Sequence, residues 1–284
     1  MNCPNCGTGT SRMRFQLRTH SIVECSACQL LYNKDYPEPH KLEEMFGADY
    51  YLRVQKQAFE YVTSGRQDPS WGIFNAGLRI VEKNVGRGNL LDVGCAFGSF
   101  LRLAASRGWN VMGVEVSAYS SQYARETLGF DVYTGDLLHA PLDGRQFDLI
   151  TFWDVIEHIR DVRGNLVRAS ELLRPGGFLI ITTDNYRGLL SALGNLLYRI
   201  SFASLKYPLE RFYIPYNSCY LTRQKLGEML AEHGFRECHY LGIDYPIQKL
   251  NLSHLERLVL PLLYSVGDLI GKNSQFLIVA KRKS

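Results

Sequence analysis

Short apolar runs alternate with amphipathic segments along the chain from residue 89 onward. Apolar runs of roughly four to eight residues are typical of buried strands, and apolar residues about three or four positions apart are typical of helices. This alternation predicts an α/β domain around a mostly parallel sheet. The predicted strands are Asn89–Val93, 111–115, 131–134, Phe147–Trp153, 178–183, Phe235–Ile243 and 276–280, and the predicted helices are 99–107, 118–128, 165–173 and 222–233.

Three regions of the chain differ in pattern. Residues 1–35 hold two tight cysteine pairs and predict a small zinc-ribbon-like module, and residues 36–85 predict a helical linker or lid. Residues 86–284 contain the α/β domain, with leucine-rich insertions at about 186–220 and 246–272. In the first insertion, apolar residues recur at helical spacing, and we expect that face to pack on the core. These residues are Leu189, Leu193, Leu196, Leu197 and Ile200.

A glycine-containing turn links the first predicted strand of the domain to its first predicted helix. Gly94 permits a tight turn and close backbone approach, and Gly98 lets the helix pack on the strand. Glu115 stands 21 residues after Gly94, at the end of the next predicted strand. An acidic group there accepts hydrogen bonds from both hydroxyl groups of a ribose. The pattern therefore predicts a nucleoside site, and a glycine-rich turn with a surface glutamate is the alternative.

The composition adds limits to this picture. With 284 residues, of which 46% are hydrophobic, the chain can bury one full core with a satellite, or two modest domains. A net charge of +4 does not by itself indicate nucleic-acid binding. The first residues lack the basic and apolar regions of a signal peptide, and no stretch reaches the ~18–20 apolar residues of a membrane helix. We therefore expect a cytoplasmic protein.

Four of the seven cysteines form two C-x2-C pairs with 18 residues between them. Four thiolates at this spacing fit tetrahedral zinc, and no further ligand is apparent, so a structural ion is favoured. A single pair would leave redox chemistry as the alternative, but two pairs argue against it. The expected zinc ligands are Cys3, Cys6, Cys25 and Cys28.

Basic residues stand between the two cysteine pairs, at Arg12, Arg14, Arg18 and His20. They form a modest basic face with which a ribbon can bind nucleic acid or a partner. The alternation of polar and apolar residues over 13–18 equally fits the outer side of a plain hairpin. We favour the hairpin, because no aromatic platform interleaves with the charges.

The glycine turn reads D-x-G-x-x-x-G, whereas dinucleotide enzymes carry G-x-G-x-x-G. Over roughly residues 85–245, the sequence resembles class I S-adenosylmethionine-dependent methyltransferases. The resemblance rests on residues 92–98, Glu115, Asp136 and the two segments 147–159 and 173–179. One departure is at position 96, where the family usually has glycine and this chain has alanine, so we expect a slight shift of the cofactor.

The resemblance implies a Rossmann-like sheet of seven strands, with S-adenosyl-L-methionine bound beyond the carboxyl ends of the strands. Glu115 is expected to hold the ribose and Asp136 the adenine amino group, the alternative being that Asp136 merely caps a turn. Carboxylates near the site would also favour a cationic sulfonium. The complete set of expected cofactor-binding residues is Asp92, Gly94, Cys95, Ala96, Gly98, Glu115, Val116, Asp136, Leu137, Trp153 and Asp154.

Methyl transfer to a hydroxyl group needs a base, and His158 is the natural catalytic candidate. The alternative is that Glu157 and His158 only fix the turn into the next helix. Related enzymes often have a histidine where Asn217 stands here, so a base from that position is not available. No Asn/Asp-Pro-Pro-Tyr/Phe motif follows the fourth strand, which disfavours methylation of amino groups on bases.

The cysteine pairs, Tyr50-Tyr51 and this type of core resemble bacterial methyltransferases of cell-surface glycan and sugar modification, whose cores are similar to ubiquinone-pathway O-methyltransferases. The resemblance implies a small-molecule or glycan acceptor, with a sugar hydroxyl as first choice. We expect residues 189–216 to cover the acceptor pocket, with Tyr213 and Tyr216 at the acceptor. The insertions alternatively form a homodimer face or dock on a membrane surface beside a lipid-linked acceptor. An RNA methyltransferase, a quinone or phenol O-methyltransferase and a non-catalytic S-adenosylmethionine-binding protein remain alternative functions.

Overall fold

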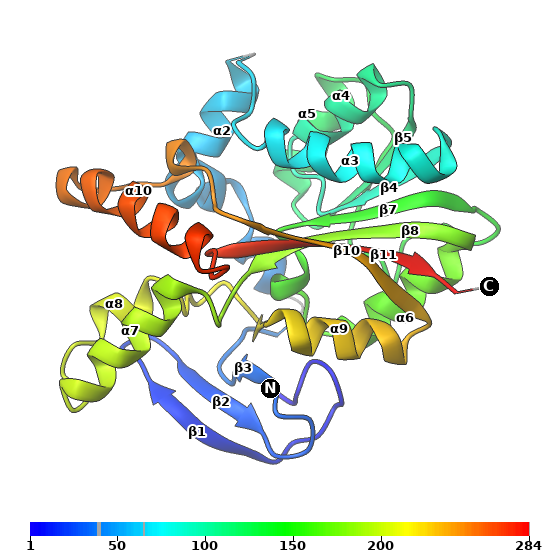
Figure 1. Ribbon diagram of the computed structural model, residues 1–284. Helices are drawn as coiled ribbons and strands as arrows, with labels where there is room; N and C mark the ends of the chain where they lie inside the picture. The colour runs from blue at the N-terminus through cyan, green and yellow to red at the C-terminus, as the bar shows by residue number, and fades with distance from the viewer. Residues whose placement is uncertain (39–40, 65, 284) are drawn as a thin grey trace.

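Seven strands form a central sheet in the computed structural model, which describes residues 1–38, 41–64 and 66–283 (Figure 1). Their order is β10-β11-β8-β7-β4-β5-β6; β4 to β8 run parallel, and β11 is antiparallel to both β8 and β10. The predicted α/β fold class and seven-stranded sheet are confirmed. The bounds are β4 (Asn89–Val93), β5 (Asn110–Glu115), β6 (Val132–Thr134), β7 (Phe147–Trp153), β8 (Leu173–Asp184), β10 (Phe235–Ile243) and β11 (Gln275–Arg282).

Helices cover both faces of this sheet (Figure 1). On one face, Phe74 and Leu78 of α3 pack against Leu90 of β4. On the other face, Leu166 of α6 packs in a second cluster with Leu91 of β4. Because water is kept from both faces, the inner strands are almost continuously apolar. The helices around the sheet are α3 (Trp71–Val85), α4 (Ser99–Ser106), α5 (Ala118–Glu126), α6 (Val162–Leu172) and α9 (Arg223–Glu232).

A second, antiparallel sheet contains the N-terminal strands in the order β1-β2-β3-β9. The predicted hairpin between the cysteine pairs is confirmed as β1 and β2. Strand β9 is distant in the sequence, so the ribbon sheet includes the last residues of the insertion 186–220. The ribbon also shares its core with the large domain, because Cys3 and Cys25 lie in the same buried cluster as Leu91. The bounds are β1 (Ser11–Gln16), β2 (Ser21–Cys25), β3 (Leu31–Asn33) and β9 (Cys219–Tyr220).

Short helices connect the ribbon to the first strand of the large sheet. Residues 39, 40 and 65 of the predicted helical linker lie outside the described residues, as does residue 284. The elements before α3 are α1 (Leu42–Met45), the π-helix η2 (Tyr50–Val54) and α2 (Lys56–Thr63). Their aromatic residues pack over the β4–α4 turn, where Tyr51 and Phe59 contact Phe97 with ring centroids 4.8 and 4.9 Å apart.

The first insertion contains α7 (Leu189–Ile200) and α8 (Tyr207–Glu210), and the second contains η4 (Ile247–Lys249) and α10 (His254–Leu269). Only the small residues Ser191 and Gly194 of α7 are buried, whereas Leu196 is 53% exposed and Ile200 is 63% exposed. The prediction that the leucine face of this helix packs on the core is therefore wrong. Helical spacing shows that apolar residues share a face, but it does not say which way that face points. Within the described residues, no helix has both the length and the apolar character to cross a membrane.

Candidate functional site

A first cavity of about 230 Å³ lies beyond the carboxyl ends of β4, β5 and β7. Its floor is the β4–α4 turn, the end of β5 at Glu115 and the end of β7 at Trp153. Its other walls come from residues between Phe46 and Phe74 and between Ile243 and Lys249. Strand ends at the middle of a doubly wound sheet are the usual binding place for ligands in such folds.

The glycine turn is shaped by close packing. Gly94 has a φ of 73°, and a Cβ at this position would collide with the side chain of Val155. Ala96 also has a positive φ, of 45°, so alanine adopts here the backbone conformation that glycine adopts most easily. The backbone N–H of Ala96 donates to Oε2 of Glu115 at 2.9 Å, and that of Ser117 donates to Oε1 at 2.8 Å. The carboxylate predicted to hold a ribose is thus fixed by two amides at the edge of the cavity.

Asp92 at the end of β4 lies against the same cavity and is only 2% exposed. Burial raises the pKa of this carboxyl to about 8, and the nearby Glu115 charge adds to the increase. The hydroxyl of Thr151 donates to Oδ1 at 2.7 Å and opposes this effect only in part. A cation placed beside Asp92 would favour its ionised form.

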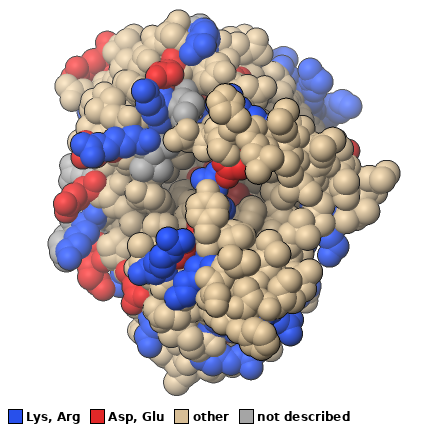
Figure 2. Space-filling model, turned by 90° about the vertical axis from the view of Figure 1, so that its left-hand side faces the viewer, with Lys and Arg blue, Asp and Glu red and all other residues tan. Residues whose placement is uncertain are grey.

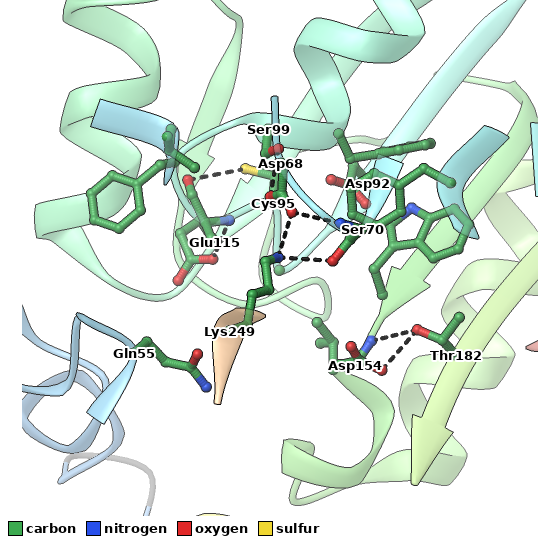
Figure 3. A pocket seen from close by; sticks show the side chains of 18 of the residues that line it. Gln55, Asp68, Ser70, Asp92, Cys95, Ser99, Glu115, Asp154, Thr182 and Lys249 are labelled. Carbon is green, nitrogen blue, oxygen red and sulfur yellow. Dashed lines mark hydrogen bonds and ion pairs between the residues drawn. The ribbon is translucent and has the colours of Figure 1, made fainter. Parts of the chain in front are cut away.

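Asp154 follows β7 and has a positive φ of 55°. Its backbone N–H donates to the Thr182 hydroxyl, which itself donates to Oδ1 of Asp154, both at 2.9 Å (Figure 3). Trp153 packs against Phe74 and Phe100 at centroid distances of 4.7 and 5.0 Å. The two residues predicted at this strand end therefore line the cavity on firmly held backbone.

A second cavity of about 620 Å³ adjoins the first, and both are lined by Phe46, Gly94, Val116, Val155 and His158. Asp136 and Leu137 line only the second cavity. Oδ1 of Asp136 accepts hydrogen bonds from the backbone N–H and ring of His139, at 2.9 and 2.7 Å. Except for Gly98, which lines neither cavity, the predicted cofactor residues thus line one or both of two adjoining cavities, with the glycine turn where they meet.

His158 lies where the two cavities adjoin. Its Nδ1 is 2.8 Å from the carbonyl oxygen of Tyr216, which can only accept, so Nδ1 carries the proton and Nε2 is free to accept one. Burial lowers the pKa of the imidazole to about 4, although the Tyr216 carbonyl opposes this effect. The turn itself is held through backbone atoms: Tyr36 donates to the His158 carbonyl at 2.6 Å and the Ser218 N–H to that of Glu157 at 2.7 Å. The turn therefore does not depend on Nε2 of His158, which is free to accept a proton.

The acceptor cover predicted for residues 189–216 is wrong. Within the described part of the chain, no residue of this range lines either cavity. Tyr213 is instead 2% exposed and packs against Tyr186 and Tyr220 beneath the ribbon. Tyr216 contacts the rings of Phe46 and Tyr50 from outside. The insertion does follow the end of β8, as the sequence predicts, but its aromatic residues pack against the ribbon and not over the cavity.

A polar cluster that sequence patterns did not predict lies in the first cavity (Figure 3). Nζ of Lys249 is 2.7 Å from Oδ1 of Asp68 and 2.8 Å from the hydroxyl of Ser70. The Ser99 hydroxyl donates to the other oxygen of Asp68 at 2.8 Å. Although burial opposes it, the Lys249 charge and these hydrogen bonds lower the pKa of Asp68. Lys249 is 181 residues from Asp68, and no local motif marks either residue, so sequence alone offered no signal for the pair.

The four ribbon cysteines come together as predicted, with all four sulfur atoms within 4.8 Å of one another. The sulfur atoms of Cys3 and Cys28, and those of Cys6 and Cys25, are each 3.5 Å apart. Zn–S bonds of about 2.3 Å in a tetrahedron place sulfur atoms about 3.8 Å apart, so the group fits zinc and is too wide for disulfides. Both knuckle turns have the same form: the amide of Gly7 donates to the Cys3 carbonyl and that of Gln29 to the Cys25 carbonyl, each at 3.0 Å.

The basic residues of the ribbon are partly neutralised, since three arginines pair with two glutamates. Arg12 and Arg14 pair with Glu24 at 2.6 and 3.2 Å, and Arg18 pairs with Glu210 at 2.9 Å. His20 is buried, and its pKa is lowered by that burial. This pattern fits a plain hairpin better than a surface for phosphates.

Comparisons with known proteins agree with this fold. The family defined as a methyltransferase domain matches residues 72–239. A ubiquinone biosynthesis O-methyltransferase of Chelativorans is 32% identical over 111 residues, which cover 37% of this chain and 43% of the relative. One of Brucella anthropi is 27% identical over 165 residues, covering 55% and 63%. The chain therefore spans only about half the length of the curated relatives it matches.

Solved structures agree at the level of the fold. An S-adenosylmethionine-dependent methyltransferase from Mesorhizobium loti has a TM-score of 0.53 at 20% identity, covering 75% of this chain and 98% of the other. Magnesium protoporphyrin IX methyltransferase from Synechocystis, with bound S-adenosylhomocysteine, has a TM-score of 0.57 at 14% identity, covering 87% and 100%. The seven-stranded sheet, the glycine turn and the family match together show that this chain belongs to the methyltransferase domain family, with the class I fold of S-adenosylmethionine-dependent methyltransferases.

Proposed function

We propose that this protein transfers a methyl group from S-adenosylmethionine to a hydroxyl group of a small-molecule or glycan acceptor. The observation that carries the proposal is the junction of two cavities at the glycine turn. The adenine would occupy the second cavity beside Asp136 and Leu137, and the ribose would bind Glu115. The methionine part would extend into the first cavity. There, the carboxyl group of Asp92 would bind its ammonium group, and the ammonium group of Lys249 would bind its carboxylate.

The chemistry needs alignment, exclusion of water and removal of one proton. The acceptor oxygen attacks the methyl carbon, the carbon–sulfur bond breaks, and its electron pair leaves the sulfur of the thioether product uncharged. The hydroxyl proton would pass to Nε2 of His158. The low pKa of His158 keeps this imidazole neutral and ready at physiological pH. Since it is a weak base, it would accept the proton late, once the oxygen has begun to bond to carbon.

The acceptor end of the first cavity combines aromatic walls with polar groups. Tyr50, Tyr51 and Phe59 provide ring faces, and Gln55 provides an amide. Ring faces and hydrogen-bonding groups together suit a sugar, which is our first choice of acceptor. They also suit a phenol, and the curated relatives named above are O-methyltransferases of ubiquinone biosynthesis, so a phenol is the second choice. The ion-paired ribbon arginines do not favour RNA.

Apolar side chains are exposed on α7, on α10 and in the loop between α7 and α8. Phe202 is 95% exposed and Leu258 is 72% exposed. Figure 2 shows uncharged surface beside a hollow, with groups of Lys and Arg close by. Lys249 of η4 lines the cavity, and α10 follows η4 in the chain. The exposed apolar side chains near the cavity therefore favour an acceptor carried on a lipid, with Arg199 and Lys206 near its phosphates. A homodimer through the same faces is the competing proposal.

The function is tested by following label from methyl-labelled S-adenosylmethionine into three acceptors: a nucleotide sugar, a polyprenyl-linked sugar in vesicles, and a catechol. We expect transfer to a sugar hydroxyl, and His158→Gln should lower kcat by about 10²–10⁴-fold while Kd for S-adenosylhomocysteine changes little. Transfer only to the catechol would support the phenol alternative. Binding of the cofactor without transfer to any acceptor would support the non-catalytic alternative and contradict our proposal.

A second prediction concerns protons released when S-adenosylmethionine binds. Asp92, with a pKa of about 8, is mostly protonated at pH 7 in the free protein, and a cationic ligand beside it lowers that pKa. Binding should therefore release close to one proton, and affinity should rise by up to about tenfold per pH unit below pH 8 and level off above it. Calorimetry in two buffers of different ionisation enthalpy measures the release. Asp92→Asn should abolish it; an unchanged release in that variant would assign the proton to another group.

A further inference from the structure

The first knuckle of the ribbon, Cys3–Gly7, lies against the cavity in which the proposed function places adenine. All five residues of this knuckle line the second cavity, together with Val116, Asp136 and Leu137. A structural ribbon that only stabilised its own fold would have no reason to form a wall of that cavity. The wall is instead shared between the two parts of the chain.

The knuckle is fixed in this place by contacts with the large domain. The backbone N–H of Val162, at the start of α6, donates to the carbonyl of Pro4 at 3.0 Å. Cys3 is buried in the same apolar cluster as the strands of the central sheet. Arg163, also at the start of α6, lines the second cavity next to the knuckle. Packing and a backbone hydrogen bond therefore set the position of the knuckle relative to Asp136 and Leu137, the residues proposed to bind adenine.

Asn5 is the knuckle residue with unused hydrogen-bonding capacity. The residue is 7% exposed, yet its amide makes no hydrogen bond with any other residue in the described ranges. Both the oxygen and the nitrogen of the amide are in contact with solvent. Asn5 lines the second cavity, so its amide can offer both a donor and an acceptor to a ligand there.

An asparagine amide pairs with adenine through two hydrogen bonds, one to the amino group and one to N7. We propose that Asn5 binds this edge of the adenine of S-adenosylmethionine, so that the zinc knuckle is part of the cofactor site. The inference rests on the proposed function and adds a recognition residue to it. It also couples the two ligands: a ribbon held by zinc presents Asn5, and a ribbon without zinc does not. By reciprocity, bound cofactor would strengthen zinc binding by the same factor.

The test compares the affinities of S-adenosylhomocysteine and S-inosylhomocysteine, in which an oxygen replaces the adenine amino group. Calorimetry is carried out on the zinc-loaded wild type, on Asn5→Ala and Asn5→Asp, and on Asn2→Ala as a matched control. Asn2 is an exposed asparagine beside the same knuckle that does not line the cavity. Zinc content of one ion per chain in each variant shows that the knuckle is intact.

We expect Asn5→Ala to weaken S-adenosylhomocysteine binding about tenfold and to shrink the preference over the inosine analogue by a similar factor. Asn5→Asp, which has lost the donor, should weaken binding as well, and Asn2→Ala should behave as wild type. Wild-type affinity and preference in zinc-loaded Asn5→Ala would overturn the inference but leave the proposed function standing. Failure of the wild type to bind S-adenosylhomocysteine would overturn both.

Discussion

Glu115→Ala is expected to reduce the affinity for S-adenosylmethionine by about ten- to 100-fold. Glu115 is 4% exposed and lines the cavity. Its loss would remove the charged acceptor of the ribose hydroxyls, worth about 1.5–3 kcal/mol for a hydrogen bond to a charged group. The variant would also leave the amides of Ala96 and Ser117 without their acceptor, which loosens the glycine turn. Calorimetric titration with S-adenosylmethionine measures the effect.

Two further variants sharpen this result. Glu126→Ala removes an exposed glutamate from the end of the neighbouring helix α5 and should bind as wild type. Glu115→Gln keeps one carbonyl acceptor but no charge, so its affinity should lie between those of wild type and Glu115→Ala. Equal affinities for wild type and Glu115→Ala would show that the carboxylate only shapes the turn.

Loss of the metal from the ribbon should have the largest structural effect. We propose that the four cysteines hold one zinc ion per chain, and structural zinc supplies about 10–16 kcal/mol of apparent binding free energy to such small modules. Cys6→Ser, or treatment with a chelator, should therefore unfold β1, β2 and β3. Strand β9 pairs only with β3 in this sheet, so it should lose protection too. Because Tyr36 and Ser218 hold the turn at His158, turnover should fall with it.

Elemental analysis and hydrogen exchange measure this effect, and Cys238→Ser is the matched control. Cys238 is a partly exposed cysteine of β10, far along the chain from the ribbon ligands, and its replacement should change neither zinc content nor exchange. Rapid exchange confined to residues 1–36 and 218–220 in Cys6→Ser is the expected result. A metal-free protein with a fully protected ribbon would contradict a structural zinc.

Local patterns predicted the elements whose position is set by local chemistry. The glycine turn, Glu115 at the end of β5 and the seven strands follow from short-range spacing and apolar runs, and the structure has them at these places. The cysteine cluster followed from pair spacing in the same way. Such features depend on residues close together in the sequence, so a single sequence contains the necessary information.

Features that depend on distant residues were missed or placed wrongly. The pair of Lys249 and Asp68 joins an insertion to the segment before α3, and nothing near either residue indicates the other. The leucines of α7 share a face, but small residues on the opposite face made the closer packing. Tyr213 packs against the ribbon because β9 pairs with β3 of the ribbon sheet. This pairing joins residues about 190 positions apart, and no local pattern encodes it.

A crystal structure of the protein with S-adenosylhomocysteine would test the central claim most directly. We predict that the adenine lies in the second cavity beside Leu137 and Asn5, that the ribose hydroxyls bind Glu115, and that the homocysteine part reaches the first cavity beside Asp92. The sulfur atom should then point toward the space in front of His158. A nucleoside bound elsewhere, or an acceptor-side cavity that the sulfur cannot reach, would contradict the assignment of this site to methyl transfer.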